Sequence, residues 1–197
     1  MSDPATLAWY QEQAPRYLAK TCGPANRHLV PFLDRLAPGA RILELGCGAG
    51  QDAAHMAGRG FAVDATDATE AMVRLAREES GVTARRMRFD ELDTEAAYDA
   101  AWAHACLIHV ARGDFAGVLA RIHRALRPGG WHFANFKLGD GEGRDPLGRL
   151  HNFPTQTWLA DAYLEAGFAI VETETYRGHG ADGVVRDWHA LTLRKPA

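Results

Sequence analysis

Apolar residues along the chain fall into two kinds of segment that alternate. Short runs rich in Val, Ile, Leu, Ala and Phe have the length of β-strands, and they predict strands at 41–45, 61–66, 84–89, 98–104, 131–136, 169–176 and 187–194. Between these runs, apolar residues recur at helical spacing, which predicts helices at 51–57, from Thr69 through Ala76, at 112–126 and at 157–166. Strands that alternate with helices are typical of a parallel α/β sheet. The last two runs have no helix between them, so we expect them to pair as an antiparallel hairpin.

Glycines mark the connections between these elements. The 20 glycines gather around 46–50, 129–130, 139–148 and 178–183. The polar, glycine-rich stretch at 137–152 exceeds the usual loop length of compact domains, and such stretches tend to be functional lids or disordered segments. We therefore expect an irregular loop after the fifth strand.

The N-terminal segment has a pattern of its own. Asp3 followed by Pro4 is a helix-start signal, and apolar and aromatic residues recur on one helical face from Leu7 through Tyr10 and Tyr17. Because Pro15 and Pro31 interrupt the pattern, we expect two or three short helices. Residues 1–38 are thus predicted to form a helical cap on one domain that spans 1–197.

Composition restricts the class of protein. The chain has 197 residues with 47% hydrophobic and 24% charged residues, which is typical of one folded domain. A net charge of −3 supplies no polybasic surface for nucleic acid or anionic lipid. The sequence contains no apolar run of a membrane span's length and no secretory signal. Cys22, Cys47 and Cys106 are scattered, which favours a reducing cytoplasm over a disulfide framework, and the histidines lack the spacing of a metal site.

A glycine-rich loop joins the first strand to the first helix after it. The segment runs Glu44-Leu45-Gly46-Cys47-Gly48-Ala49-Gly50, and glycines there allow a sharp turn and close approach of a ligand to the backbone. The following helix offers unpaired N–H groups to a polar ligand. Gln51 stands where a dinucleotide-binding loop would require its last glycine.

An acidic residue follows at the end of the second strand. Asp67 lies 21 residues after Gly46, and an acid at this place in a doubly wound sheet can accept hydrogen bonds from both hydroxyls of a ribose. Taken singly, the glycines also fit an ordinary turn and Asp67 also fits a helix N-terminal acid. In this order they favour a nucleoside site.

The segment 41–50 resembles the first motif of the class I S-adenosylmethionine-dependent methyltransferases. The resemblance continues through Asp67, Met72, Asp90, Tyr98-Asp99, Leu107-Ile108-His109 and 126–130, and Ala166-Gly167-Phe168 with the final hairpin extends it. It implies a Rossmann-like, mostly parallel seven-stranded sheet of order 3-2-1-4-5-7-6, with the last strand antiparallel and helices on both faces. Residues 141–158 are also similar to small bacterial methyltransferases of tellurite resistance or small metabolites.

The resemblance also implies a binding site for S-adenosylmethionine. Glu44 would orient the methionine ammonium, Asp67 would hold the ribose, and Ala103 and His104 would lie beneath the sulfonium. The full set of implied cofactor residues is Glu44, Gly46, Cys47, Gly48, Gly50, Asp67, Ala68, Met72, Phe89, Asp90, Ala103 and His104. The family often has a bulkier residue at the position of Ala68.

Candidates for chemistry and acceptor binding come from position. His104 ends the fourth strand, where open α/β sheets place ligands, so it is the candidate catalytic residue, with a packed histidine as the alternative. His109 lies in a turn, where we expect it to satisfy nearby backbone groups. Arg149 and His151 are candidates for clamping an acceptor, or belong to a solvated loop. Tyr10 and Tyr17 face the site, or simply pack the N-terminal helix on the domain.

These observations favour a methyltransferase that uses S-adenosylmethionine and a small-molecule acceptor. The methyltransferase core accounts for most of the chain and leaves no room for a nucleic-acid-binding domain. Two alternatives remain open. A nicotinamide-dependent oxidoreductase is opposed by Gln51 and the terminal hairpin, whereas a non-catalytic module that binds S-adenosylmethionine is compatible with the sequence, because methyl transfer requires no fixed catalytic residue.

Overall fold

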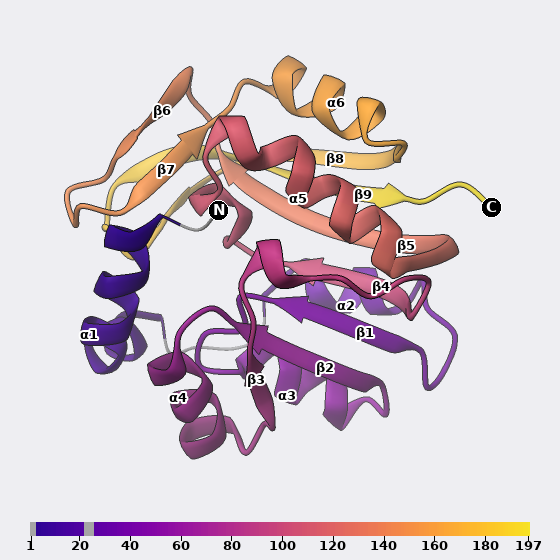
Figure 1. Cartoon of the computed structure of the whole chain (residues 1–197), viewed down its shortest axis with the longest axis horizontal. Helices are drawn as coiled ribbons and strands as arrows, with labels where there is room; N and C mark the ends of the chain where they lie inside the picture. Colours follow the sequence, from indigo (N-terminus) through magenta and orange to yellow (C-terminus); the bar gives the residue numbers. More distant parts are fainter. Residues whose placement is uncertain (1–2, 22–25) are drawn as a thin grey trace.

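The computed structural model describes residues 3–21 and 26–197, which fold around a seven-stranded sheet (Figure 1). The strands of this sheet are β1 (Arg41–Leu45), β2 (Ala62–Asp67), β3 (Ala84–Arg86), β4 (Tyr98–Ala103), β5 (Leu126–Lys137), β8 (Ala169–His179) and β9 (Val185–Arg194). Their order is β3-β2-β1-β4-β5-β9-β8. Strand β9 runs antiparallel to both of its neighbours, β5 and β8, whereas the other neighbouring strands pair in parallel. The predicted fold and strand order are confirmed, since β8 and β9 are the sixth and seventh strands of the main sheet.

Helices cover both faces of the sheet because its central strands are apolar on both sides. Along β1, Ile42 packs in a cluster with α2 (Leu29–Leu33) and α3 (Gln51–Gly58). Its neighbour Leu43 packs in a different cluster with α5 (Arg112–Ala125) and α6 (Gln156–Glu165). This alternation is the period of a strand buried on both faces. Helix α4 (Glu70–Ser80) begins at Thr69, whose hydroxyl accepts a hydrogen bond from the Met72 amide as predicted.

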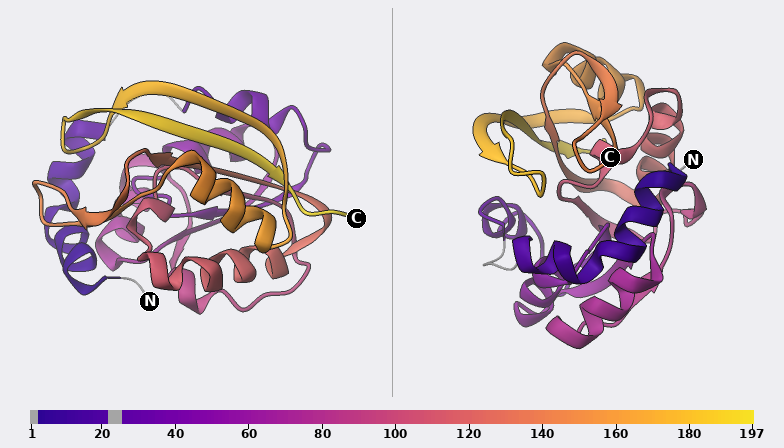
Figure 2. Two further views of the ribbon diagram at one scale, coloured as in Figure 1. Left: turned by 90° about the horizontal axis from the view of Figure 1, so that it is seen from above. Right: turned by 90° about the vertical axis from the view of Figure 1, so that its left-hand side faces the viewer.

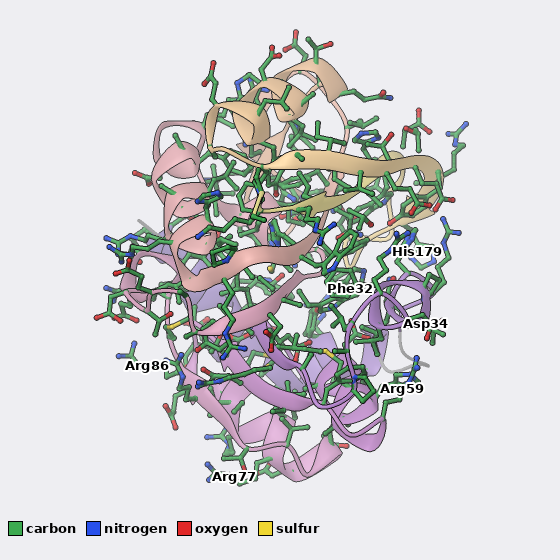
Figure 3. The ribbon with its side chains drawn as sticks, turned by 90° about the vertical axis from the view of Figure 1, so that its right-hand side faces the viewer. Phe32, Asp34, Arg59, Arg77, Arg86 and His179 are labelled. Carbon is green, nitrogen blue, oxygen red and sulfur yellow. The ribbon has the colours of Figure 1, made fainter. Side chains whose placement is uncertain are left out.

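The edge strand β3 is shorter than predicted. It ends at Arg86, and residues Phe89–Glu91 form a short 3-10 helix, η1, instead of continuing the strand. The Glu91 carboxylate accepts a hydrogen bond from the Arg88 amide, so a side chain takes the place of a strand partner. Arg86 is exposed at this edge, and Figure 3 shows it pointing away from the ribbon. Charge at an edge protects it from pairing with other chains.

The stretch after β5 forms a small second sheet, and the expectation of an irregular loop is wrong. Strands β6 (Gly141–Arg144) and β7 (Leu150–Phe153) pair antiparallel. The turn between them is held from inside, because the amides of Leu147 and Arg149 both donate to the Asp145 carboxylate. The composition of this segment does not predict the hairpin, because its strands contain few apolar residues. The hairpin is stabilised instead by the buried charges of Asp145 and Arg149.

Helix α1 (Pro4–Thr21) lies across the edge of the sheet where the parallel strands end (Figure 2, right). Its backbone is non-helical at Gln13, two residues before Pro15, so it consists of two short helices that meet at a kink. The Asp3 carboxylate accepts hydrogen bonds from the amide and hydroxyl of Thr6 and caps the first turn. With α2, these segments match the expected set of short N-terminal helices. None of the helices in the described ranges has the length and apolar character of a membrane span.

Candidate functional site

The loop between β1 and α3 requires glycine for two reasons. Gly46, Gly48 and Gly50 have φ values of 67°, 55° and 82°, a region that side chains with a Cβ rarely adopt. A Cβ on Gly46 would also lie 2.5 Å from the Cβ of Cys106. The loop therefore runs directly against the turn that follows β4.

Asp67 ends β2 and faces this loop. Its Oδ2 accepts a hydrogen bond from the Gly48 amide at 3.2 Å, and its Oδ1 accepts from the amide of Thr69 at 3.0 Å. Burial raises the pKa of the Asp67 carboxyl to about 6, and these hydrogen bonds oppose that rise. The glycine loop and the acid that the sequence pairs are thus in direct contact.

Glu44 is buried next to the same loop. Glu44 is 3% exposed, and its Oε2 has no hydrogen-bond partner among the described residues. Burial raises the pKa of the Glu44 carboxyl well above its usual range. A buried carboxyl oxygen without a partner is costly, and an ammonium group placed beside it would supply the missing hydrogen bond and charge.

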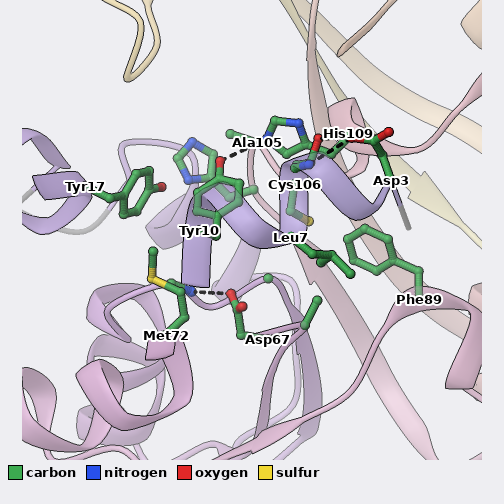
Figure 4. Close-up of a pocket in the computed structure, with 15 residues that line it drawn as sticks. Asp3, Leu7, Tyr10, Tyr17, Asp67, Met72, Phe89, Ala105, Cys106 and His109 are labelled. Carbon is green, nitrogen blue, oxygen red and sulfur yellow. Dashed lines mark hydrogen bonds between the residues drawn. The ribbon is translucent and has the colours of Figure 1, made fainter. Parts of the chain in front are cut away.

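A first cavity lies between this loop, η1 and α1 (Figure 4). Seven of the predicted cofactor residues line it: Gly46, Gly48, Asp67, Ala68, Met72, Phe89 and His104. Leu7 and Tyr10 from α1 close its other side. The sequence patterns of four separate segments therefore converge on one cavity.

Five other predicted cofactor residues lie outside this lining. Glu44 and Cys47 line a second cavity instead, and the other three line neither cavity. The backbone of Gly50 packs against Ala76, where a Cβ would meet Ala76 Cβ at 3.2 Å. The Asp90 carboxylate pairs with Arg88 at 3.2 Å. Ala103 is fully buried in the sheet, and its place in the lining is taken by Ala105, which has a φ of 51°.

A second, larger cavity of about 750 Å³ continues from the first. It extends from Glu44 and Cys47 to the turn between β8 and β9. The four predicted acceptor residues all line it: Tyr10, Tyr17, Arg149 and His151. Its size is in the usual range for small-molecule sites, which is about 300–1,000 Å³.

Arg149 and His151 are buried within the β6–β7 hairpin, which differs from a solvated loop. Arg149 is 2% exposed and donates from Nε and Nη2 to Oδ2 of Asp145, at 3.0 and 2.6 Å. Its Nη1 donates to the Tyr10 hydroxyl at 2.7 Å. The same Asp145 oxygen lies 3.2 Å from Nε2 of His151, and burial lowers the pKa of His151 to about 4. Arg149 therefore connects the hairpin to Tyr10, and the charge of Arg149 is already balanced by Asp145.

His109 is the residue whose role the sequence misses. Its Nδ1 donates to the carbonyl of Leu150 at 2.7 Å, and its Nε2 accepts from the Tyr10 hydroxyl at 2.9 Å. Burial lowers the pKa of His109 well below its usual range, so the ring is neutral. The Leu150 carbonyl lies in the β6–β7 hairpin and not in the turn around His109, and no sequence pattern indicates that contact.

His104 also lines both cavities, but its ring is engaged. Asn26 Nδ2 donates to its Nε2 at 2.7 Å, and its Nδ1 lies 3.7 Å from Oδ2 of Asp52. Asp52 in turn accepts a hydrogen bond from Trp102 Nε1 at 2.9 Å. Burial lowers the pKa of His104, which favours the neutral ring.

The described part of the chain holds no group of three His, Cys, Asp or Glu side chains placed as metal ligands. Cys47 and Cys106 are buried free thiols, and Cys22 lies outside the described residues.

Comparisons with known proteins agree with this geometry. A family model described as "Methyltransferase domain" matches residues 42–130. A solved structure of the Burkholderia thailandensis 1,6-didemethyltoxoflavin-N1-methyltransferase, with 1,6-didemethyltoxoflavin and S-adenosylhomocysteine bound, is 25% identical, with a TM-score of 0.78 over 96% of this chain and 85% of that one. The chain belongs to the class I S-adenosylmethionine-dependent methyltransferases. The predicted family is confirmed.

Curated methyltransferases show the same relationship over part of their length. A ubiquinone biosynthesis O-methyltransferase from Methylocella silvestris is 40% identical over 138 residues, which is 67% of this chain and 52% of that protein. An O-methyltransferase from Pyrenophora dematioidea is 27% identical over 78% of this chain and 64% of that protein. The chain thus spans between about half and two thirds of the length of these relatives.

Proposed function

We propose that this chain transfers the methyl group of S-adenosylmethionine to a small-molecule acceptor. The observation that carries the proposal is the junction of the two cavities. Both are lined by Tyr10, Tyr17, Gly46, Gly48, His104, Ala105 and His109. A cofactor in the first cavity and an acceptor in the second would therefore meet at these residues, as alignment for methyl transfer requires.

The residues of the first cavity, together with Glu44 and Cys47 from the adjoining wall of the second, fit the cofactor. S-adenosylmethionine, when bound, supplies a methyl group already activated by its sulfonium. The unpaired Oε2 of Glu44 fits the ammonium of its amino acid part, and Gly46, Cys47 and Gly48 allow the cofactor to approach the backbone. Asp67 fits the ribose hydroxyls, and Ala68, Met72 and Phe89 offer apolar contacts to the adenine. Gly50, Asp90 and Ala103 would act through the backbone around the cavity and not by lining it.

The remaining residues orient the acceptor and exclude water. Residues 1–38 act as a cap in this proposal, because Leu7, Tyr10 and Tyr17 of α1 line the first cavity. His104 and His109 are neutral at the junction, so each can accept a proton there once its present partner is displaced. Relatives are named for O-methyl transfer and for N1-methyl transfer. Identifying the methylated product of this chain therefore identifies the atom that accepts the methyl group.

The proposal is tested in two steps. Isothermal titration calorimetry with S-adenosylhomocysteine comes first, and we expect binding at micromolar concentration. Incubation with methyl-labelled S-adenosylmethionine and a broad metabolite pool, followed by mass analysis, then identifies the product. Absence of S-adenosylhomocysteine binding would overturn the proposal. Binding without any labelled product would favour a non-catalytic module, and a fluorescence titration with NADH tests the oxidoreductase.

A further inference from the structure

A patch of polar and aromatic side chains lies in the second cavity, on the part of the sheet formed by β5, β9 and β8. Lys137 and Trp188 are register partners on β5 and β9, with the ammonium 5.6 Å from the indole centroid. Tyr176 on β8 is the register partner of Trp188, and the two rings are nearly parallel, 12° apart with centroids at 6.4 Å. Asn135 Nδ2 donates to the Tyr176 hydroxyl at 3.0 Å. All four residues line the cavity.

One donor in this patch has no partner. The indole Nε1 of Trp188 makes no hydrogen bond within the described residues, although the residue is 5% exposed. A buried donor left unsatisfied costs about 1–3 kcal/mol. The sheet thus presents a buried N–H group that requires an acceptor atom from elsewhere.

The neighbouring Lys137 is held by a carboxylate from the turn between β8 and β9. Its Nζ donates to Oδ2 of Asp182 at 3.0 Å, and the two side chains are 1% and 0% exposed. Arg186 lies 3.5 Å from the same oxygen. Asp182 therefore occupies a position where the two cations Lys137 and Arg186 converge, which is an arrangement suited to a carboxylate.

The turn that carries Asp182 is built to lie directly on these donors. A Cβ on Gly180 would be 2.7 Å from Lys137 Nζ, and a Cβ on Gly178 would be 3.5 Å from Trp188 Nε1. Glycine at both positions allows the backbone to cover the ammonium and the indole N–H. The turn also lines the second cavity, so its movement would open both donors to that cavity.

We propose that this patch recognises an anionic group on a planar, conjugated methyl acceptor, and that Asp182 fills the anion position until the acceptor binds. The acceptor ring lies against the Trp188 and Tyr176 rings, while its carboxylate or other oxyanion replaces Asp182 at Lys137 and accepts from Trp188 Nε1. This inference rests on the proposed function, since it takes the second cavity as the acceptor site. It differs from a clamp by Arg149, whose charge Asp145 already balances.

The test uses matched planar probes that differ only in charge. Calorimetry on the chain saturated with S-adenosylhomocysteine compares 4-hydroxybenzoate with 4-hydroxybenzamide, and 6-hydroxy-2-naphthoate with its carboxamide. We expect at least one carboxylate to bind tenfold or more tightly than its amide. Asp182→Asn removes the internal competitor and should strengthen carboxylate binding severalfold, with little effect on the amide.

Two further variants separate recognition from folding. Lys137→Met leaves Asp182 buried without its partner, so Lys137→Met is combined with Asp182→Asn to keep the pair uncharged. The double variant should lose most of the preference for carboxylate, because of the two cations only Arg186 remains there. Arg177→Met is the matched control, because Arg177 lies on the same hairpin in an exposed pair with Asp187. It should retain the preference.

The outcomes are distinct from those that test the methyltransferase proposal. Equal affinity of acid and amide for both pairs, or a preference of undiminished size in the double variant, would overturn the anion site and show that Lys137 and Asp182 form a structural pair only. Failure of S-adenosylhomocysteine to bind would instead overturn the proposed function, and it is measured before any probe is added.

Discussion

The hydroxyl of Tyr10 lies 2.9 Å from Nε2 of His109, a residue 99 positions further along the chain. Because Nδ1 of His109 donates to the Leu150 carbonyl, Nε2 is the acceptor and the Tyr10 hydroxyl is the donor. The hydroxyl oxygen accepts from Arg149 in turn. One side chain on α1 thus ties the cap to the turn after β4 and to the β6–β7 hairpin.

We expect Tyr10→Phe to weaken the hold of α1 on the site. The variant keeps the ring but leaves a donor of Arg149 and an acceptor of His109 without their partner, a loss typical of a hydrogen bond to a charged group. S-adenosylhomocysteine affinity should fall roughly tenfold, or about 1.4 kcal/mol, as measured by calorimetry. Glu12→Gln, on the exposed face of the same helix, is the control. Unchanged affinity in Tyr10→Phe would mean that this contact does not retain the cofactor.

Asp67→Ala tests the ribose assignment. Removal of the carboxylate eliminates a pair of charge-assisted hydrogen bonds, so S-adenosylhomocysteine should bind more weakly by roughly 1–3 kcal/mol. Calorimetry at pH 8, where the native carboxyl is ionised, gives the comparison. If the two proteins bound equally well, Asp67 would serve only to order the glycine loop through the Gly48 amide.

The pH dependence of binding provides an independent test of the same carboxyl. Burial raises the pKa of Asp67 to about 6 in the protein without ligand. The ionised form is the better acceptor for two hydroxyls, so affinity is fully present above that pKa and is lost as the pH falls through it, by up to about tenfold per pH unit. Titrations between pH 5 and 8 should show this decline in the native chain and a shallower one in Asp67→Ala. A decline of equal steepness in both would assign it to another group.

The parts of the site that the sequence predicts are those whose signal is local. The turn at Gly46 and the acid at Asp67 come from consecutive segments whose spacing the parallel strands dictate, and they do meet in the structure. The contact of Arg149 with Tyr10 spans 139 positions, and no pattern within either segment indicates it. The β6–β7 hairpin escapes prediction for a related reason, because the buried Asp145 carboxylate organises its turn and polar composition alone resembles a loop.

His104→Ala should lower turnover more than it lowers cofactor affinity. The side chain lies at the junction of the two cavities, and burial lowers its pKa and so favours the neutral ring. Its loss removes a group that would accept a proton from the acceptor or position it for methyl transfer. Removal of a general base costs on the order of 10²–10⁴-fold in rate. Single-turnover rates with the acceptor found in the labelling screen, compared with S-adenosylhomocysteine affinity, separate the two effects. A fall in affinity alone would make His104 a cofactor-pocket residue.

Gly46→Ala should destabilise the fold, whereas Gly58→Ala should not. Alanine at Gly46 must adopt a φ of 67° and places its Cβ 2.5 Å from Cys106 Cβ, which together should cost at least about 2 kcal/mol. Gly58 ends α3, and a Cβ there would have no atom within 4 Å, so alanine should be neutral or stabilising by about 0.5 kcal/mol. Urea unfolding gives both values. Because the overlap involves the Cβ of Cys106, adding Cys106→Ala should not rescue Gly46→Ala, and a full rescue would assign the strain to the thiol instead.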